Sequence, residues 1–411
     1  MKARQAAAPH PGGGLPTLRR AATSTTVISE PLFPSFWMAG FECSSHRRLD
    51  GVRLDLLRAT RHDRFAFQDY RRCAEFGFDC IRDGLRWHLI EQQPGRFDWS
   101  SWLPMVDAAQ EAGVEVIWDI FHYGYPDFHD PLSDDFIPAY AEYAAAFAVK
   151  HLEHTGKPVR AVPLNEISFF TWALETGYFP PALGKDHPIG WMKRRLVRAA
   201  IAAAEAMEDA CPDRRFYWAE PLIHVAPHDH SARQRRNAEK YRLSQFEAYD
   251  MLLGITEPQL GGHPQMVDAI GVNFYPHNQW YFDGPTIPMG HHEYRPMRDM
   301  LVEVWERYGK PLFISETGAE ASGRPAWLHY VCDEVRAAMA LGVPIGAICL
   351  YPITDYPGWD NGRHCDVGLF GDADRDGNRP IYEPLLEELA RQQALFERDR
   401  EVLLPIPSSA S

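Results

Sequence analysis

The sequence predicts an α/β fold, a single (β/α)8 TIM barrel. Short apolar segments alternate with helical patterns about eight times along the chain, which is typical of parallel βαβ units. The length of 411 residues suits one large domain, and no change in composition divides the chain. A closed barrel is therefore favoured over a doubly wound fold of two domains. We predict that the barrel covers residues 31–400, between a disordered tail over 1–30 and a C-terminal tail over 401–411.

The predicted strands are short apolar segments that end at polar or turn-forming residues. In chain order they cover 36–41, 80–87, 114–121, 159–164, 216–220, 269–274, 312–315 and 347–350. The helical patterns between and after them cover 65–76, 102–112, 137–155, 191–210, 238–251, 297–308, 325–341 and 383–400. Gly77 and Gly113, directly after the first two helical patterns, are typical C-caps. The charged segment 50–64 and the Pro-, Gly- and His-rich segment 276–295 are predicted loops.

Composition and charge argue against several classes of protein. The net charge is −14, from 56 acidic and 42 basic residues, which disfavours a nucleic acid or an anionic membrane as partner. The chain has no run of about 18 apolar residues that could span a membrane. Residues 1–30 lack the apolar core of a signal peptide and resemble an organellar transit peptide only faintly. We therefore expect a cytoplasmic protein with no membrane partner.

The seven cysteines indicate thiols buried in the core. They are odd in number, they lack CxxC spacing, and several lie in apolar segments. This pattern favours neither disulfides nor a zinc site. The histidine-rich segments around His228 and His291 have no cysteine partners and no HExxH spacing. We expect neither a metal nor a cofactor.

Two glutamates, Glu166 and Glu316, follow the fourth and seventh predicted strands. In a closed barrel the carboxyl ends of all strands open onto one face, so these side chains should meet there. Glycoside hydrolysis needs such a pair: one carboxylic acid protonates the leaving oxygen, and the other attacks the anomeric carbon or activates water. Either glutamate alone would be an ordinary loop residue. Other polar strand ends strengthen the interpretation: Arg82, His122, Asn165 and Tyr275.

Five segments, in this order along the chain, resemble the retaining β-glycosidases of glycoside hydrolase family 1. They are Ile81-Arg82 with Trp87, FHYGYP at 121–126, LNE at 164–166 with GYFPP at 177–181, DAIGVNFY at 268–275 and FISETGA at 313–319. The resemblance implies that Glu166 is the general acid/base and Glu316 the nucleophile. It also implies that Arg82 and Tyr275 flank Glu316 and keep it ionised, because a cation and a hydrogen-bond donor favour a charged carboxylate.

The resemblance further implies that Asn165 binds the 2-hydroxyl of the sugar and that His122 contacts another hydroxyl. Trp359 is expected to stack on the substrate. The chain departs from the family at Gly358, where a glutamate would grip the outer hydroxyls, and near the first strand, where Glu42 lies in place of a glutamine. These departures predict a glycone other than glucose.

The predicted reaction is hydrolysis of a β-linked glycoside with retention, on a small carbohydrate substrate. A transglycosidase with the same residues remains an alternative. A non-catalytic carbohydrate-binding protein on a degenerate barrel is another, motivated by the missing glutamate at Gly358 and opposed by the two retained glutamates. Glu220, after the fifth strand, could enter the pocket or lie at the rim of the barrel.

Overall fold

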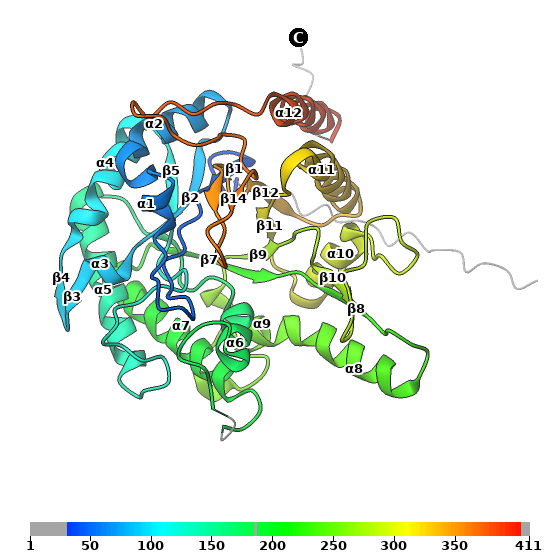
Figure 1. The fold of residues 1–411 in the computed structure, drawn as a ribbon, viewed down its shortest axis with the longest axis horizontal. Coiled ribbons are helices and arrows are strands. Elements are labelled where there is room, and N and C mark those ends of the chain that lie inside the picture. Colours follow the sequence, from blue (N-terminus) through cyan, green and yellow to red (C-terminus); the bar gives the residue numbers. More distant parts are fainter. Residues whose placement is uncertain (1–30, 185–186, 404–411) are drawn as a thin grey trace, which may run out of the picture.

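The computed structural model describes residues 31–184 and 187–403, and the described chain contains a closed barrel of eight parallel strands (Figure 1). The order around the barrel is β1-β12-β11-β9-β7-β6-β5-β2. The strands are β1 (Trp37–Gly40), β2 (Cys80–Gly84), β5 (Glu115–Asp119), β6 (Arg160–Val162), β7 (Arg215–Pro221), β9 (Ala269–Asn273), β11 (Leu312–Thr317) and β12 (Ile345–Leu350). The predicted (β/α)8 fold class is confirmed. The predicted N-terminal tail and residues 404–411 lie outside the described residues.

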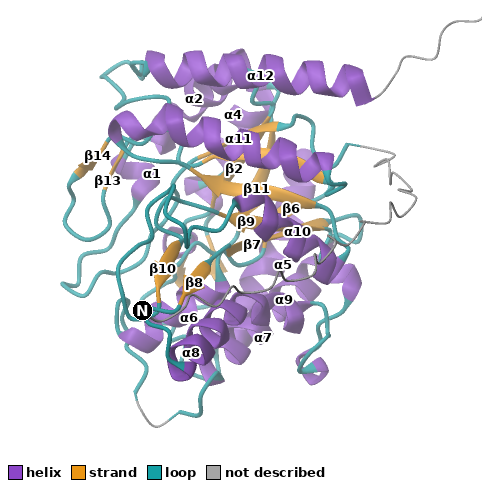
Figure 2. Ribbon diagram, turned by 90° about the vertical axis from the view of Figure 1, so that its right-hand side faces the viewer, coloured by secondary structure: helices purple, strands orange, loops and turns teal. Residues whose placement is uncertain are grey.

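Helices surround the barrel, and Figure 2 shows α11 and α12 lying side by side along one flank. The helices are α1 (Leu56–Ala59), α2 (His62–Glu75), α3 (Trp87–Ile90), α4 (Leu103–Ala112), α5 (Phe136–Thr155), α6 (Ile167–Thr176), α7 (Trp191–Ala210), α8 (Ala232–Leu243), α9 (Glu247–Leu252), α10 (Met297–Tyr308), α11 (Arg324–Ala340) and α12 (Glu383–Leu403). The helix predicted over 238–251 is divided into α8 and α9 by a 3₁₀ turn at Ser244–Phe246. None of the described helices is long and apolar enough to cross a membrane.

Small two-stranded sheets follow the carboxyl ends of barrel strands and so lie on the face where those strands end. They pair β3 (Glu91–Gln93) with β4 (Arg96–Phe97), β8 (His224–Ala226) with β10 (Gln279–Tyr281), and β13 (Tyr356–Pro357) with β14 (His364–Cys365). Two short 3₁₀ helices, η1 (Trp99–Ser101) and η5 (Ala321–Gly323), also follow barrel strands, whereas η2 (Ser244–Phe246) joins α8 to α9, and η3 (Pro258–Leu260) and η4 (Pro264–Met266) lead from α9 into β9. The connections at this face are therefore partly ordered by their own hydrogen bonds.

Two predicted loops contain regular structure, so those predictions are wrong in part. Within 50–64, α1 forms because Leu56 and Leu57 are buried, at 1% and 0% exposure, and the Asp55 carboxylate accepts a hydrogen bond from the backbone of Arg58. Within 276–295, β10 forms because its backbone pairs with β8. High charge and turn-forming residues hide such short elements from a reading of the sequence alone.

The barrel interior is a packed core. Met38, Ile117, Tyr217 and Phe313 are buried there together, at 0% exposure each. A larger apolar cluster fills the layer between the strands and the outer helices. A filled interior leaves the carboxyl ends of the strands as the face on which polar side chains can gather.

Candidate active site

Glu316 lies near the carboxyl end of β11, where the strand is irregular. The pairing of β11 with β9 shifts register between Ile314 and Glu316, which marks a bulge at Ser315. A bulge at a strand end re-aims the side chain that follows it. The Glu316 side chain is nearly buried, at 5% exposure, so its carboxylate needs hydrogen-bond donors.

Each oxygen of the Glu316 carboxylate has a donor. Arg82 Nη1 donates to Oε1 at 2.8 Å, and the Tyr275 hydroxyl donates to Oε2 at 2.8 Å. Both donors come from other strand ends, β2 and the residues after β9. The guanidinium and the hydroxyl together hold the Glu316 carboxylate in one orientation.

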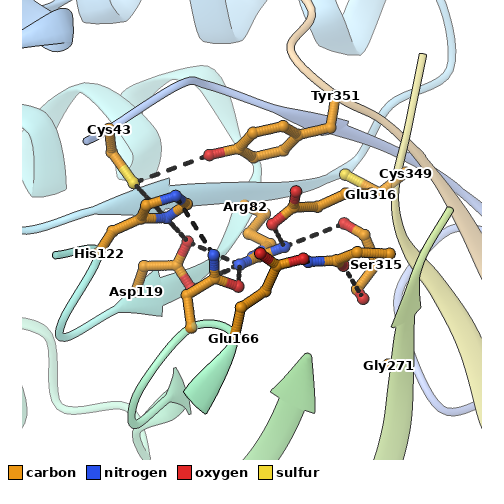
Figure 3. Close-up of polar contacts among 12 residues, drawn as sticks. Cys43, Arg82, Asp119, His122, Glu166, Gly271, Ser315, Glu316, Cys349 and Tyr351 are labelled. Atoms are coloured by element: carbon orange, nitrogen blue, oxygen red, sulfur yellow. Dashed lines mark hydrogen bonds and ion pairs between the residues drawn. The ribbon is translucent and has the colours of Figure 1, made fainter. Parts of the chain in front are cut away.

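Arg82 is the centre of the polar network (Figure 3). Its side chain is fully buried; Nε and Nη2 donate to Asp119 Oδ1 at 3.2 and 3.1 Å, and Nη2 also donates to Asn165 Oδ1 at 2.6 Å. Nη1 additionally donates to the carbonyl of Ser315 at 3.1 Å. Burial would lower the pKa of Arg82, but the Asp119 and Glu316 carboxylates raise it well above its ordinary value. Arg82 is therefore a fixed positive charge beneath the strand ends.

Glu166 lies between β6 and α6 in a left-handed backbone conformation, with φ 45° and ψ 65°. Its half-buried carboxyl accepts hydrogen bonds from the Tyr123 hydroxyl at 3.1 Å and from Asn273 Nδ2 at 2.9 Å. Burial, followed by the charge of Glu316, raises the pKa of Glu166 to about 8, and the two hydrogen bonds act in the opposite direction. Near neutral pH, Glu166 is thus protonated and can donate a proton.

Asn273 connects the neighbours of the two glutamates. The Ser315 hydroxyl donates to Asn273 Oδ1 at 2.6 Å, which turns the amide nitrogen of Asn273 toward Glu166. Gly271 makes this possible, because a Cβ at that position would lie 2.6 Å from Ser315 Oγ. Ser315, the residue before Glu316, therefore orients the Asn273 amide that donates a hydrogen bond to Glu166.

Asn165 lies within the same network, at 1% exposure. Besides accepting from Arg82, its Nδ2 donates to the Tyr123 hydroxyl at 3.0 Å and lies 3.3 Å from His122 Nε2. A chain of hydrogen bonds thus runs from Glu166 through Tyr123, Asn165 and Arg82 to Glu316.

His122 lies in a buried polar group beside this chain, at 3% exposure. Its Nδ1 is 3.2 Å from Asp119 Oδ2 and 3.3 Å from Cys43 Sγ, and its Nε2 is 3.8 Å from Glu42 Oε1. Glu42 also accepts from the backbone and hydroxyl of Ser44, at 3.0 and 2.6 Å. Burial would lower the pKa of His122, but Asp119 and Glu42 raise it above its ordinary value.

Trp359 is half-buried in an aromatic group after β12. Its ring centroid is 5.0 Å from His46, 5.8 Å from Tyr123 and 6.0 Å from Phe169. Its Nε1 has no hydrogen-bond partner among the described residues. Since Tyr123 donates to Glu166, this aromatic group adjoins the site of the proton donor.

Several residues of the site were not predicted as site residues: Asp119, Tyr123 and Asn273. A signal was present for Asp119, because a carboxylate inside the apolar segment VEVIWDIF must have a buried partner. Tyr123 and Asn273 lie in segments that carried the family resemblance, but their contacts cross between strands. The seven residues predicted as site residues, with Trp359 at the edge, lie in one connected region.

Two groups of described residues have the spacing of metal ligands: Cys43, Asp119 and His122, and Asp355, His364 and Asp366. In the first group the Arg82 guanidinium already contacts Asp119, at 3.0 Å. A metal ion there would meet a competing cation. The second group lies mostly at the surface, where acidic clusters are common.

Comparison with family models and with curated proteins finds no match to this sequence. Comparison with solved structures finds many. The family 1 β-glucosidase from Thermotoga maritima has a TM-score of 0.68 at 15% identity, over 88% of this chain and 97% of that chain. The fold is that of the family 1 β-glucosidases.

Two further solved structures lead to the same conclusion about the fold. A β-glycosidase from Pyrococcus horikoshii has a TM-score of 0.69 at 15% identity, over 90% of this chain and 98% of that chain. A rice β-glucosidase mutant in a covalent complex with Glc has a TM-score of 0.68 at 14% identity, over 87% and 98%. The family resemblance in the sequence is therefore confirmed at the level of the fold.

Proposed function

We propose that the protein hydrolyses a β-linked glycoside with retention of configuration, with Glu316 as nucleophile and Glu166 as general acid/base. One observation carries the proposal: the two carboxyl groups have opposite environments. Glu316 accepts from a guanidinium and a hydroxyl, whereas burial and the Glu316 charge raise the pKa of Glu166 to about 8. A carboxyl group with a raised pKa and a second carboxyl group held by hydrogen-bond donors are what a general acid and a nucleophile need.

The proposed reaction has two steps. A Glu316 oxygen attacks the anomeric carbon and forms an ester bond, while the bond to the leaving oxygen breaks and that oxygen takes the Glu166 proton. Water then attacks the same carbon, its proton returns to Glu166, and the ester bond to Glu316 breaks. The second displacement restores the original configuration.

The other site residues have supporting roles in this proposal. Arg82 and Tyr275 hold the Glu316 carboxylate in place for attack. Asn165 and His122 bind hydroxyls of the sugar, and Trp359 packs against the substrate. The proposed substrate is a small β-glycoside, and glucose is not carried over from the β-glucosidases, because Gly358 and Glu42 replace two of the family's sugar contacts.

A panel of aryl β-glycosides that differ in the sugar tests the proposal. The wild-type protein should hydrolyse at least one of them, and Glu316→Gln should abolish that activity. Glu320→Gln is the matched control, since the Glu320 side chain is exposed and pairs with Arg363. Sugar binding without turnover of any glycoside would favour a non-catalytic binding protein. A larger yield of transfer product than of free sugar, with acceptor sugars present, would favour a transglycosidase.

A further inference from the structure

Glu220, near the end of β7, is buried at 3% exposure and touches the helix that follows Glu166. Its two carboxylate oxygens lie 3.1 and 3.3 Å from the backbone nitrogen of Ser168, which donates to them. Ser168 is the second residue of α6. The first backbone N–H groups of a helix have no partner within the helix, and a negative charge there is favourable. Glu220 therefore caps α6 from a neighbouring strand.

The residue immediately before α6 is Glu166, and its backbone is held on both sides by β7. Its own N–H donates to the carbonyl of Ala219 at 2.9 Å, and two residues later Ser168 donates to Glu220. The left-handed φ of 45° at Glu166 is uncommon for a residue with a side chain. Such a conformation persists only where the surrounding structure holds it. Ala219 and Glu220 supply that support.

We infer that Glu220 is a positioning residue for the acid/base: it anchors the start of α6 and places a negative charge beside Glu166. The inference rests on the proposed role of Glu166 in proton transfer. Glu220 has no step of its own in the proposed reaction, and it affects the reaction through the position and the pKa of Glu166.

The charged and titratable groups that face Glu220 define its electrostatic effect. Lys193 faces it from α7, Tyr249 from α9, and Glu166 from the start of α6. Burial raises the pKa of Glu220 to about 7, and the Ser168 side chain, Lys193 and the first N–H groups of α6 oppose that rise. The charge of Glu220 raises the pKa of Glu166, after burial and Glu316. Removing that charge should lower the pKa of Glu166.

Glu334 offers a matched control within the same molecule. Its carboxylate is buried, at 6% exposure, and accepts from the backbone nitrogen of Arg298 at 2.9 Å. Arg298 is the second residue of α10, so Glu334 caps a helix in the same way as Glu220. Glu334 lies on the outer helix α11, and its neighbours are Arg298, Tyr294 and Tyr330. A purely structural role predicts the same outcome for both glutamates.

The first test compares Glu220→Gln with Glu334→Gln. Carbon-13 NMR of glutamate-labelled protein, with the Glu166 signal assigned by its loss in Glu166→Gln, gives the titration midpoint without any substrate. We expect Glu220→Gln to move that midpoint toward acid by about half a unit or more, because a like charge has been removed. Glu334→Gln should leave it unchanged. An unchanged midpoint in Glu220→Gln, or equal shifts in both variants, would overturn the electrostatic part of the inference.

The second test uses Glu220→Asp, which keeps the charge but shortens the reach to Ser168. On alkyl glycosides, whose leaving group needs a proton, kcat/KM should fall about 10- to 100-fold through misplacement of the acid. On dinitrophenyl glycosides, whose leaving group needs no proton, kcat/KM reports only the first step and should stay within about threefold. Equal losses on both substrates would overturn the positioning role. If the wild-type protein hydrolyses no glycoside, the proposed function fails, while the NMR titration still decides the inference.

Discussion

Arg82 Nη1 lies 2.8 Å from Glu316 Oε1, and the same guanidinium contacts Asp119 and Asn165. Arg82 thus fixes the Glu316 carboxylate and, through Asn165 and Tyr123, the hydrogen-bond network that reaches Glu166. A single buried cation therefore aligns both carboxyl groups of the proposed mechanism.

Replacing Arg82 by lysine should test this alignment. Lysine keeps the charge but has no planar fork to contact several oxygens at once. We expect kcat/KM to fall about 100-fold or more, and the free energy of unfolding to fall by ~3 kcal/mol because buried carboxylates lose partners. Arg363→Lys, at an exposed pair with Glu320, should leave the free energy of unfolding nearly unchanged, because solvent screens that pair. Wild-type kcat/KM in Arg82→Lys would contradict the role of Arg82.

The pH dependence of activity should report Glu166. Its protonated form is the acid, so kcat/KM for alkyl glycosides should be kept below pH 8 and lost as the pH rises through the pKa of about 8. Glu166→Ala should remove this limb and lower kcat/KM on alkyl glycosides by about 10²- to 10⁴-fold. The loss on dinitrophenyl glycosides should be smaller. A basic limb that persists in Glu166→Ala would assign the acid to another group.

Because of the same shift in pKa, Glu166 should lower the stability of the folded protein at high pH. A carboxyl whose pKa rises on folding, here from 4.5 to about 8, favours the folded state below pH 4.5, and this contribution is lost as the pH rises through 8. Glu166→Gln removes the titration. In urea unfolding, the free energy of unfolding of Glu166→Gln, measured relative to that of the wild type, should therefore rise by ~2 kcal/mol or more from pH 5 to pH 9. A difference in stability that does not change between these pH values would contradict the raised pKa.

Trp359 should affect binding more than chemistry. Its ring packs near Tyr123 and Phe169, and its Nε1 makes no hydrogen bond with either glutamate. Trp359→Ala should raise KM about tenfold, equivalent to ~1.4 kcal/mol, with kcat within about threefold. Trp172→Ala, a more exposed ring at 41% exposure, is the comparison and should raise KM less. A fall in kcat at constant KM would place Trp359 in support of Glu166 instead.

The cysteines should be unreactive in the folded protein. All seven are free and buried, and burial raises the pKa of Cys43, Cys73 and Cys80 well above the ordinary value. Because the thiolate is the reactive form, a disulfide reagent should react with almost no thiols before unfolding and with seven afterwards, without any reductant. Fewer than seven thiols after unfolding would reveal a disulfide.

The sequence allowed most of the barrel to be predicted, because its strands are apolar and its helices have regular periodicity. Helix α6 was not predicted, and the structure explains why. No side chain near its own start caps it, and Glu220, 52 residues away from Ser168, does so instead. Strand β11 was predicted to end at residue 315, since Glu316 is polar, yet Glu316 is paired with β9.

Part of the candidate site could likewise be predicted from the sequence, and part could not. Glu166 and Glu316 could be found because each follows an apolar segment, and the barrel topology brings strand ends together. The contact of Asn273 with Glu166 joins residues 107 apart and depends on a bulge in the neighbouring strand β11 and on Gly271 in the same strand as Asn273. Local sequence patterns do not show contacts between residues so far apart, and these contacts can be seen only in the folded chain.

The covalent bond to Glu316 is the central claim, and trapping it is the most direct test. The protein would be incubated with an activated 2-deoxy-2-fluoro β-glycoside of the best sugar from the panel, and its peptides mapped by mass spectrometry. We predict one fluorosugar per protein, attached to Glu316, with activity lost in proportion. Continued turnover without an adduct, or an adduct on another carboxylate, would contradict the account.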